Sequence, residues 1–304
     1  MSKILFTGST GLVGSRVCEL LRNNHEITTI SRDIGNADIQ SDLNDLSHLK
    51  KTLENLDFEN IFHFAGFTAV DEAENQKGDI EGQCYQTNVN MTQNILNIAA
   101  SYNAKVFFIS TDFVFNGENG PYSETDPTGS SDDLSWYGWT KKLAEDNILN
   151  DSEKHQIIRI AYPFRSNFTK GDFARDIISK MENKSLYPLF YDQFLTPTFI
   201  DNLADFINLS LERSLSGVYH LANSDLVTPY SFGQIINDVF EFNYPIEKGS
   251  IHSFRQNFPN KAKRPVKGGL VTKKVESLGV PVLTNEEAIK ILKTQINSKS
   301  AKIS

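Results

Sequence analysis

The most informative segment of this chain is Thr7-Gly8-Ser9-Thr10-Gly11-Leu12-Val13-Gly14, which follows a short apolar run and opens a helical pattern. A tight turn needs a residue that can adopt positive φ, a pyrophosphate must approach backbone without a Cβ, and the helix must pack closely on the strand. The helix also presents free N–H groups and its positive dipole end to the phosphates. The segment therefore predicts a dinucleotide-binding turn, and we assign to the cofactor Gly8, Thr10, Gly11, Leu12, Val13 and Gly14.

Strand and helix patterns alternate through the first half of the chain. The apolar runs typical of strands are Lys3–Thr7, Glu26–Ser31, Ile61–Ala65, Lys105–Ser110 and Gln156–Ala161. Helical patterns lie between them, at Leu12–Leu21, Asp45–Leu56, Gln86–Tyr102 and Ser135–Leu149, where Ser135 is a suitable N-cap. This rhythm predicts an α/β fold, a Rossmann-type doubly wound parallel sheet with helices on both faces.

The alternation loosens after about Pro163, where proline and aromatic residues become frequent. The elements expected beyond it are helices at Asn202–Arg213, Tyr230–Phe242 and Glu286–Ile296, a strand at Val218–Ala222, an irregular segment at Ile246–Phe258 and a frayed tail at Ser298–Ser304. We therefore expect a dinucleotide-binding domain over residues 1–165, with a return excursion at about 196–226. Residues 166–304 are expected to form a smaller C-terminal substrate-binding lobe.

Composition and charge restrict the class of protein. The chain has 304 residues and a formal net charge of −8. This acidic balance argues against nucleic acid or an anionic membrane as the main partner. Neither a leader-like segment nor an apolar run of transmembrane length is visible in the sequence, so we expect a cytoplasmic protein.

Cysteine and histidine spacing indicates neither a disulfide framework nor a metal centre. Cys18 and Cys84 stand outside any CxxC motif, and we expect both to be buried thiols in a reducing compartment. The 6 histidines are scattered without the spacing of metal ligands, so we predict no catalytic metal.

The end of the second predicted strand should meet the adenosine ribose of a dinucleotide. An acidic residue there would bind the 2′-hydroxyl, whereas an arginine would suit a 2′-phosphate. Ser31 and Arg32 come first in this sequence, which favours NADP, while reading by Asp33 would mean NAD. Four more residues are assigned to the cofactor, two near the adenine and two where the third strand ends, namely Asp42, Leu43, Ala65 and Gly66.

A tyrosine and a lysine stand four residues apart in Tyr137-Gly138-Trp139-Thr140-Lys141, which places them on one face of a predicted helix. A phenol with a pKa near 10 is a poor acid–base catalyst at neutral pH, and a nearby ammonium lowers that pKa by stabilising the phenolate. Tyr137 and Lys141 are therefore predicted to protonate an alkoxide as it forms, and both are also assigned to the cofactor site.

A carbonyl substrate also needs a donor that polarises it. Ser110 and Thr111 stand at the carboxyl end of the fourth strand, where open parallel sheets bind ligands. We choose Thr111 as the third catalytic residue, with Ser110 as the alternative.

The tyrosine–lysine spacing occurs a second time, from Tyr244 to Lys248. That copy contains Pro245 and runs into Gly249, so a helix is not expected. We assign it no chemistry.

Several ordered motifs resemble a known family. The glycine turn, the run Ser110-Thr111-Asp112-Phe113-Val114-Phe115-Asn116-Gly117 and the Tyr137–Lys141 motif together resemble the extended short-chain dehydrogenases. Within these, the likeness is strongest to the dTDP-4-dehydrorhamnose reductase family. It rests on further segments along nearly the whole chain, namely Thr68–Glu74, Thr87–Val89, Pro197–Thr198, Asn202–Ala204, Gly217–Leu221 and Arg264–Pro265.

The resemblance implies the reduction of a 4-keto sugar on a nucleotide by hydride from NAD(P)H. Thr111, Tyr137 and Lys141 would be the catalytic triad, Lys141 would also bind the nicotinamide ribose, and Asn88 would support the active site. The family also implies a possible homodimer. The residues expected near the substrate are Val70, Asp71, Phe113, Tyr162 and Arg264.

Four departures from the family pattern fall on the substrate side. The family usually has tyrosine at the position of Phe113 and often tryptophan at that of Tyr162. Its arginine–proline motif usually runs on to a serine where this chain has Gly268, and the loop Gly129–Asp133 is slightly extended. These departures leave the triad intact.

Two other functions stay open from the sequence. One is a sugar-nucleotide epimerase or dehydratase, although a dehydratase commonly has Asp-Glu after the threonine and this chain has Asp112-Phe113. The other is a regulatory subunit like that of methionine adenosyltransferase, which binds a dinucleotide without obvious turnover. The intact triad favours an enzyme.

Overall fold

The computed structural model describes residues 1–32, 35 and 37–300, and the chain divides into two compact units. The first unit consists of Met1–Asn116, Pro127–Arg159 and Leu203–Tyr219, and the second of Gly117–Asp126, Ile160–Asn202 and His220–Ser304. The predicted division at residue 165 lies shortly after Arg159. The sequence predicts that the chain returns to the first domain at about 196–226, and the first unit contains Leu203–Tyr219 of this range. The short segment Gly117–Asp126 belongs to the second unit, which the sequence does not predict.

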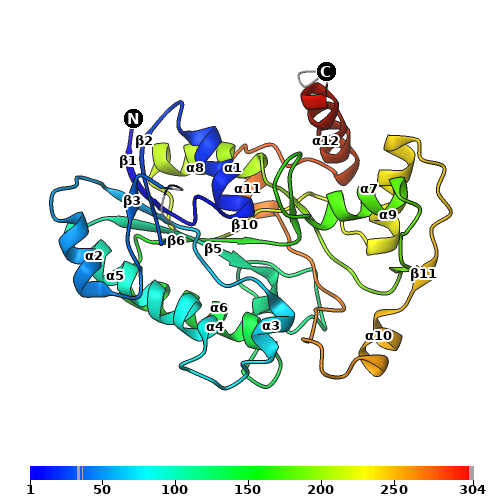
Figure 1. The fold of residues 1–304 in the computed structure, drawn as a ribbon, viewed down its shortest axis with the longest axis horizontal. Coiled ribbons are helices and arrows are strands. Elements are labelled where there is room, and N and C mark those ends of the chain that lie inside the picture. Colours follow the sequence, from blue (N-terminus) through cyan, green and yellow to red (C-terminus); the bar gives the residue numbers. More distant parts are fainter. Residues whose placement is uncertain (33–34, 36, 301–304) are drawn as a thin grey trace. The chain divides into compact units, whose positions relative to one another are not determined.

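A seven-stranded sheet forms the centre of the first unit (Figure 1). Its order is β10-β6-β5-β4-β1-β2-β3, and the pairs β1–β2, β1–β4, β2–β3 and β4–β5 are parallel. The strands are β1 (Lys3–Thr7), β2 (Glu26–Ser31), β3 (Ile39–Gln40), β4 (Asn60–His63), β5 (Lys105–Thr111), β6 (Gln156–Ile160) and β10 (Gly217–His220). Because the chain goes from β1 to β2 on one side and returns to β4 on the other, the strand order reverses at β1.

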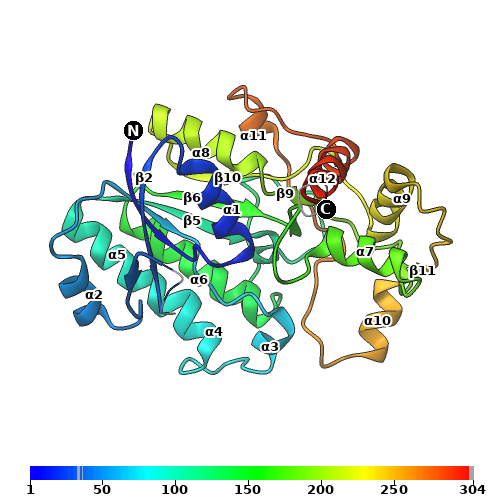
Figure 2. The same cartoon turned by 45° about the horizontal axis from the view of Figure 1, so that its top comes forward.

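Helices cover both faces of this sheet, as Figures 1 and 2 agree. One face carries α1 (Leu12–Leu21) and α8 (Asn202–Arg213), and the other carries α2 (Leu46–Leu53), α5 (Met91–Tyr102) and α6 (Trp136–Asp151). Apolar side chains of the sheet and of α2, α5 and α6 form one buried cluster. The fold is therefore the doubly wound α/β fold of Rossmann type that the sequence predicts.

The second unit has its own core of helices and short strand pairs. Strand β7 (Pro163–Phe164) pairs with β9 (Thr198–Phe199), and β8 (Leu189–Phe190) pairs with β11 (Lys248–Gly249). Apolar residues of three helices, α7 (Phe173–Glu182), α9 (Pro229–Phe240) and α12 (Asn285–Ser300), form its buried cluster. Two shorter helices, α10 (Ile251–Asn257) and α11 (Lys273–Glu276), complete it.

Some predicted elements differ from the observed ones. The helix expected at Gln86–Tyr102 is preceded by the short α4 (Gln83–Tyr85) and begins as a π-helical turn at Gln86–Asn90. The segment Ile246–Phe258 is not irregular throughout, because α10 forms within it behind the N-cap Ser250, whose hydroxyl accepts a hydrogen bond from the Ser253 N–H.

The chain's tail also differs from the prediction. Helix α12 continues to Ser300, so the first part of the tail expected to fray is helical. The rest of that tail, residues 301–304, lies outside the described residues. Within the described part of the chain, no helix is both long and apolar enough to span a membrane.

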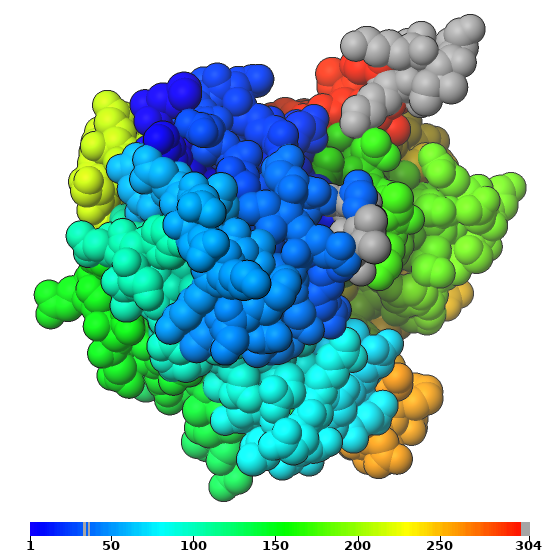
Figure 3. Space-filling model, turned by 60° about the vertical axis from the view of Figure 1, so that its left-hand side comes forward, coloured from blue at the N-terminus to red at the C-terminus, as the bar shows by residue number. Residues whose placement is uncertain are grey.

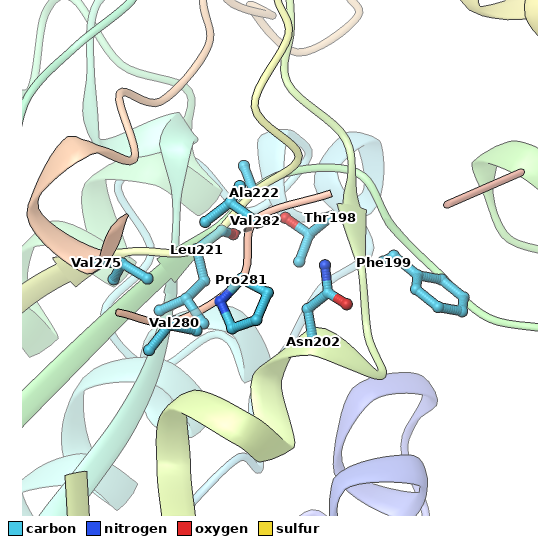
Figure 4. A pocket seen from close by; sticks show the side chains of 9 residues that line it. All are labelled: Thr198, Phe199, Asn202, Leu221, Ala222, Val275, Val280, Pro281 and Val282. Carbon is cyan, nitrogen blue, oxygen red and sulfur yellow. Dashed lines mark hydrogen bonds between the residues drawn. The ribbon is translucent and has the colours of Figure 1, made fainter. Parts of the chain in front are cut away.

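A small cavity lies in the second unit between β9 and the loop at Val280–Val282 (Figure 4). Thr198, Asn202 and Pro281 lie around it, whereas the Phe199 ring points away. Its volume of about 10 Å³ is roughly that of a single water site. This cavity is therefore too small to be the binding site of an organic substrate.

Candidate active site

A different structural reason accounts for glycine at each of the three positions of the first turn. Gly8 has φ +73°, and a Cβ there would lie 2.4 Å from the Ala65 nitrogen. A Cβ on Gly14 would lie 2.2 Å from the Gly8 oxygen, so Gly14 lets α1 pack closely on the turn. A Cβ on Gly11 would meet only the Gly8 oxygen, at 3.4 Å. Contacts within the described chain therefore explain Gly8 and Gly14, whereas Gly11 leaves the backbone open to a ligand.

The start of α1 fits an anionic group. Its N-cap is Gly11, no side chain caps the helix, and no acidic residue lies in its first turn. The hydroxyl oxygen of Ser9 is buried and has no hydrogen-bond partner among the described residues. Free N–H groups, a dipole end and an unsatisfied hydroxyl suit the pyrophosphate of a dinucleotide.

The residues assigned to the adenosine end lie around the ends of β2 and β3. Ser31 ends β2, and Arg32 follows it with an exposed side chain. Asp42 is exposed, whereas Leu43 is buried and its carbonyl accepts a hydrogen bond from Asn94. In Figure 3 the early part of the chain, in blue, forms the surface at the front of the first unit. Asp33, the alternative ribose ligand, lies outside the described residues.

Ala65 and Gly66 follow β4, next to β1 in the sheet, where the strand order reverses. The crevice at the carboxyl ends of the strands at such a point is where open α/β sheets bind ligands. The predicted strand Ile61–Ala65 ends at His63, so both residues belong to the loop. A Cβ on Gly66 would lie 3.3 Å from the Asn88 Oδ1 and 4.0 Å from the Lys141 Nζ.

Helix α6 presents Tyr137 and Lys141 one turn apart. Ser135 is its N-cap, as predicted, and accepts a hydrogen bond from the Gly138 N–H. A Cβ on Gly138 would lie 2.3 Å from the Phe113 carbonyl oxygen, so this glycine allows α6 to approach the turn that follows Thr111. Gly138 is thus a packing requirement of the site that the tyrosine–lysine spacing alone does not reveal.

Burial controls the pKa of Tyr137 in this structure. The sequence leads us to expect that the Lys141 ammonium lowers this pKa, but the dominant effect is burial, which raises it. A hydrogen bond with Thr111 opposes that effect, and the charge of Asp112 adds to it. The phenol is therefore a proton donor held in its neutral form, with Thr111 as its hydrogen-bond partner.

Lys141 is buried and partly neutralised. Its Nζ donates a 2.8 Å hydrogen bond to the Ile109 carbonyl and lies 3.7 Å from the centre of the Phe108 ring. Burial lowers its pKa to about 7, against the attraction of Glu145, which pairs with Arg159 at 2.6 Å. The lysine can thus exchange a proton near neutral pH.

Thr111 ends β5, and its hydroxyl makes hydrogen bonds with Tyr137 and Asp112. Besides the hydrogen bond with Tyr137, its hydroxyl donates to the Asp112 carboxyl at 3.3 Å. The Ser110 hydroxyl is also buried but has no hydrogen-bond partner among the described residues. This geometry favours Thr111 over Ser110 as the partner of Tyr137.

Asp112 is a buried carboxyl group beside this pair. Its Oδ2 has no hydrogen-bond partner within the described chain. Burial raises its pKa to about 7, which the hydrogen bond from Thr111 opposes. In the sequence, Asp112 serves only to compare families, and no local pattern there indicates this property.

The expected substrate residues are divided between the two units. In the first unit, Val70 and Phe113 pack in one cluster with Tyr137, and the Phe113 and Tyr137 rings meet edge to face at 5.7 Å. Asp71 follows Val70 on α3 (Val70–Glu74). Tyr162 and Arg264 belong to the second unit.

Asn88 links the cofactor loop to the catalytic helix. Its Oδ1 accepts a 2.8 Å hydrogen bond from the Phe67 N–H, and its Nδ2 donates to the Thr140 hydroxyl at 2.9 Å. Thr140 in turn donates to the Tyr137 carbonyl. Asn88 lies in the π-helical turn, a distortion that is frequent at functional sites.

His63 organises a second buried chain of hydrogen bonds, which sequence reasoning missed. The Thr92 hydroxyl donates to the Asn88 carbonyl, so it accepts from His63 Nε2 at 3.1 Å. His63 Nδ1 then accepts from the Thr7 hydroxyl at 2.9 Å, and Thr7 accepts from the Ala65 N–H. Burial lowers the pKa of His63 to about 3, so the ring is neutral. A histidine in a strand carries no local signal for such a role.

Two other predictions from the sequence can be compared with the structure. Tyr244 and Lys248 do not share a helix, because Lys248 lies in β11 and Tyr244 lies after α9. Cys18 and Cys84 are free, buried thiols, as predicted.

Comparison with known proteins assigns these features to a family. Residues 2–297 match the family described as RmlD substrate binding domain. The chain is 27% identical over 287 residues to the spore coat polysaccharide biosynthesis protein SpsK of Bacillus subtilis, a match that covers 92% of this chain and 93% of that protein. It is 26% identical over 304 residues to dTDP-4-dehydrorhamnose reductase from Aggregatibacter actinomycetemcomitans, covering 95% and 98%.

Solved structures show the same fold. A dTDP-4-dehydrorhamnose reductase from Bacillus anthracis, in complex with NADP, superimposes with a TM-score of 0.84 at 21% identity. The match covers 97% of this chain and 99% of that one. The two proteins therefore share a fold over 97% of this chain.

Proposed function

This chain belongs to the RmlD substrate binding domain family, and from that premise we propose that it is an NADPH-dependent reductase of a 4-keto sugar nucleotide. The observation that carries the proposal is the arrangement of Thr111, Tyr137 and Lys141 in the first unit. A neutral phenol is hydrogen-bonded to Thr111, and a buried lysine on the same helix face lies close to Gly66 of the cofactor loop.

In the proposed reaction, residues of this chain donate the proton and the hydrogen bonds that the carbonyl needs. The nicotinamide of the bound cofactor supplies the hydride. Thr111 would donate a hydrogen bond to the substrate carbonyl oxygen, and the Tyr137 phenol would donate its proton to that oxygen. Lys141, whose pKa burial lowers to about 7, would then return a proton to Tyr137 and hold the nicotinamide ribose.

The cofactor would lie along the carboxyl edge of the first unit's sheet. Its pyrophosphate would meet the N-terminus of α1 beside the Ser9 hydroxyl, and Arg32 would bind a 2′-phosphate, which favours NADP over NAD. The other residues assigned to the cofactor are Gly8, Thr10, Gly11, Leu12, Val13, Gly14, Ser31, Asp42, Leu43, Ala65 and Gly66.

The substrate would be a nucleotide sugar, as the name of the relative dTDP-4-dehydrorhamnose reductase suggests. The residues assigned to the substrate are Val70, Asp71, Phe113, Tyr162 and Arg264. The proposal also includes location in the cytoplasm, which we expect from the sequence, and a homodimer, which the resemblance implies.

Steady-state oxidation of NADPH with a panel of 4-keto sugar nucleotides tests the function. We expect net turnover with a dTDP-4-keto-6-deoxy sugar. An epimerase or dehydratase would convert a sugar nucleotide without consuming NADPH, and a regulatory subunit would bind NADPH without turnover. Either of these results would replace the proposal.

A further inference from the structure

Gln193 is a buried amide in the second unit. Only 2% of the residue is exposed. Its Nε2 donates one hydrogen bond to the Tyr162 hydroxyl oxygen at 3.1 Å and another to the Pro265 carbonyl at 3.0 Å. One side chain thus joins the segment after β6, its own segment after β8 and the segment that contains Arg264.

Tyr162 needs such a partner because its backbone is strained. Its φ is +42°, in the left-handed region that a bulky side chain rarely adopts. The next residue is Pro163, which further restricts the backbone before it. Such conformations are unfavourable and persist where surrounding contacts hold them. The contacts of Tyr162 include the hydrogen bond from Gln193 and the Phe173 ring, whose centre lies 5.0 Å from that of Tyr162.

The second hydrogen bond from Gln193 ends beside a cationic pocket. The residues on both sides of Pro265 have contacts of their own. On one side, the Val266 carbonyl accepts a hydrogen bond from the Phe194 N–H at 2.7 Å. On the other side, the Arg264 guanidinium lies 5.7 Å from the Phe254 ring centre. The pocket, with a volume of about 200 Å³, is lined in part by the cationic side chains of Arg255, Lys261, Lys263 and Arg264.

The residue before Gln193 holds the other wall of this pocket. The Asp192 carboxylate accepts hydrogen bonds from the Ser250 hydroxyl at 2.5 Å and from the Ile251 N–H at 2.7 Å. These contacts fix the start of α10, which carries Phe254 and Arg255. Two consecutive side chains therefore contact three segments, namely those that contain Tyr162 and Arg264 and the start of α10.

We propose that Gln193 is a positioning residue for the sugar nucleotide, which holds Tyr162 and the Arg264–Pro265 segment in the geometry that binds it. The inference rests on the proposed function, because Tyr162 and Arg264 are substrate residues there. Gln193 acts through these two residues and contributes to substrate affinity, while proton transfer in the first unit and cofactor binding do not depend on it.

Gln193→Met tests the proposal, since methionine has a similar length and no donor. The loss of two buried hydrogen bonds predicts that KM for a dTDP-4-keto-6-deoxy sugar rises roughly thirtyfold, which corresponds to about 2 kcal/mol. We expect kcat and the NADPH dissociation constant to stay within about twofold of wild type. An unchanged KM, or a fall in kcat of the same size, would overturn the proposal.

The matched control is a second glutamine–tyrosine pair in the same unit. Gln234 donates to the Tyr230 hydroxyl at 3.5 Å on the exposed face of α9. Gln234→Met should leave KM unchanged. In a double-mutant cycle, Gln193→Met and Tyr162→Phe should raise KM non-additively, because both break the same contact. Additive effects would contradict a role for Gln193 through Tyr162.

Gln193→Glu keeps the proposal testable if the methionine variant folds poorly. The carboxylate keeps the shape and loses both donors, whereas its protonated form regains one. The excess KM over wild type should therefore shrink as the pH is lowered from about 8 to 5.5. A pH-independent excess would speak for a merely structural role and against the proposal.

Binding of dTDP-rhamnose by calorimetry separates the two levels of inference. If wild type binds it and Gln193→Met binds it equally well, the role of Gln193 is wrong and the proposed function stands. If wild type neither binds this nucleotide sugar nor turns over any 4-keto sugar nucleotide, the proposed function fails, and the role of Gln193 fails with it.

Discussion

Asp112 shows how a single buried carboxyl group can make stability depend on pH. Burial raises its pKa to about 7, whereas an unfolded aspartate titrates near 4. Between these values the folded state binds the extra proton, so this group makes the protein less stable as the pH rises from about 4 to about 7. Above about 7 the cost is fully present, because the carboxylate is then charged in both states.

Replacement of Asp112 by asparagine removes this cost and nearly keeps the shape. Asp112→Asn should raise the free energy of unfolding by about 1–3 kcal/mol at pH 8, the cost of an unsatisfied buried group, and change it little at pH 4. Denaturant unfolding at both pH values measures this. Asp238→Asn, at an exposed carboxylate on α9, is the control and should show no such difference. A gain from Asp112→Asn that is equal at both pH values would contradict the assignment.

Arg32 is the residue that should make the protein bind NADPH more tightly than NADH. Only NADPH carries the 2′-phosphate that a guanidinium can bind, and a charge-assisted hydrogen bond contributes about 1.5–3 kcal/mol. Arg32→Ala should therefore weaken NADPH roughly tenfold to a hundredfold and leave NADH nearly unchanged. Fluorescence titration with both cofactors measures the two affinities. Lys51→Ala, at an exposed cation on α2, is the control, and an unchanged preference in Arg32→Ala would exclude the NADP assignment.

At the scale of an element, we expect two glycines at the start of α1 to have different roles, with Gly11 required for ligand binding and Gly14 for packing. Gly11 has ordinary extended backbone and room for a Cβ, whereas a Cβ on Gly14 would lie 2.2 Å from the Gly8 oxygen. Gly11→Val should therefore fold normally and lose dinucleotide binding. Gly14→Ala should destabilise the protein by about 1–3 kcal/mol, the usual cost of overpacking.

Thermal unfolding and cofactor titration of the two glycine variants measure these effects. Gly14→Ala is the control for Gly11→Val, since it tests a glycine that the protein's own packing requires. Normal cofactor affinity in Gly11→Val would refute the placement of the phosphates at this turn. A large loss of stability in that variant would show that packing, and not a ligand, requires Gly11.

The elements of the first unit could be predicted because local signals agree there. Helix α1 occupies the predicted Leu12–Leu21, and α6 begins after its predicted cap Ser135. Helix α7 escaped prediction although Ala174, Ile177, Ile178 and Met181 are buried at helical spacing, because the surrounding prolines and aromatics suggested irregular structure. The seven-residue α10 is too short for periodicity to reveal.

At the scale of the whole molecule, the site could be predicted only in part. The turn at Gly8 is a local motif, and so is the pair Tyr137 and Lys141. Each can be recognised from its spacing in the sequence. The contacts of Asn88 with Thr140 and of Gln193 with Pro265 join residues 52 and 72 positions apart. Such pairs follow from the tertiary fold, and no local pattern encodes them. The sign of the pKa shift of Tyr137 was missed for the same reason, because burial is a property of the folded chain.

The central claim is that Tyr137 donates the proton in a reductase. Tyr137→Phe removes one hydroxyl and keeps the ring, so the fold and cofactor binding should survive. Turnover of NADPH with a dTDP-4-keto-6-deoxy sugar should fall roughly 10²–10⁴-fold, the usual contribution of a positioned acid. Tyr244→Phe is the control, because Tyr244 has the same spacing to a lysine but does not lie on a helix.

The most direct test is the turnover number of these two variants, measured side by side with a substrate that wild type reduces. We expect Tyr137→Phe to be nearly inactive with an unchanged NADPH affinity, and Tyr244→Phe to turn over like wild type. Normal turnover in Tyr137→Phe, or loss of activity in Tyr244→Phe, would contradict it.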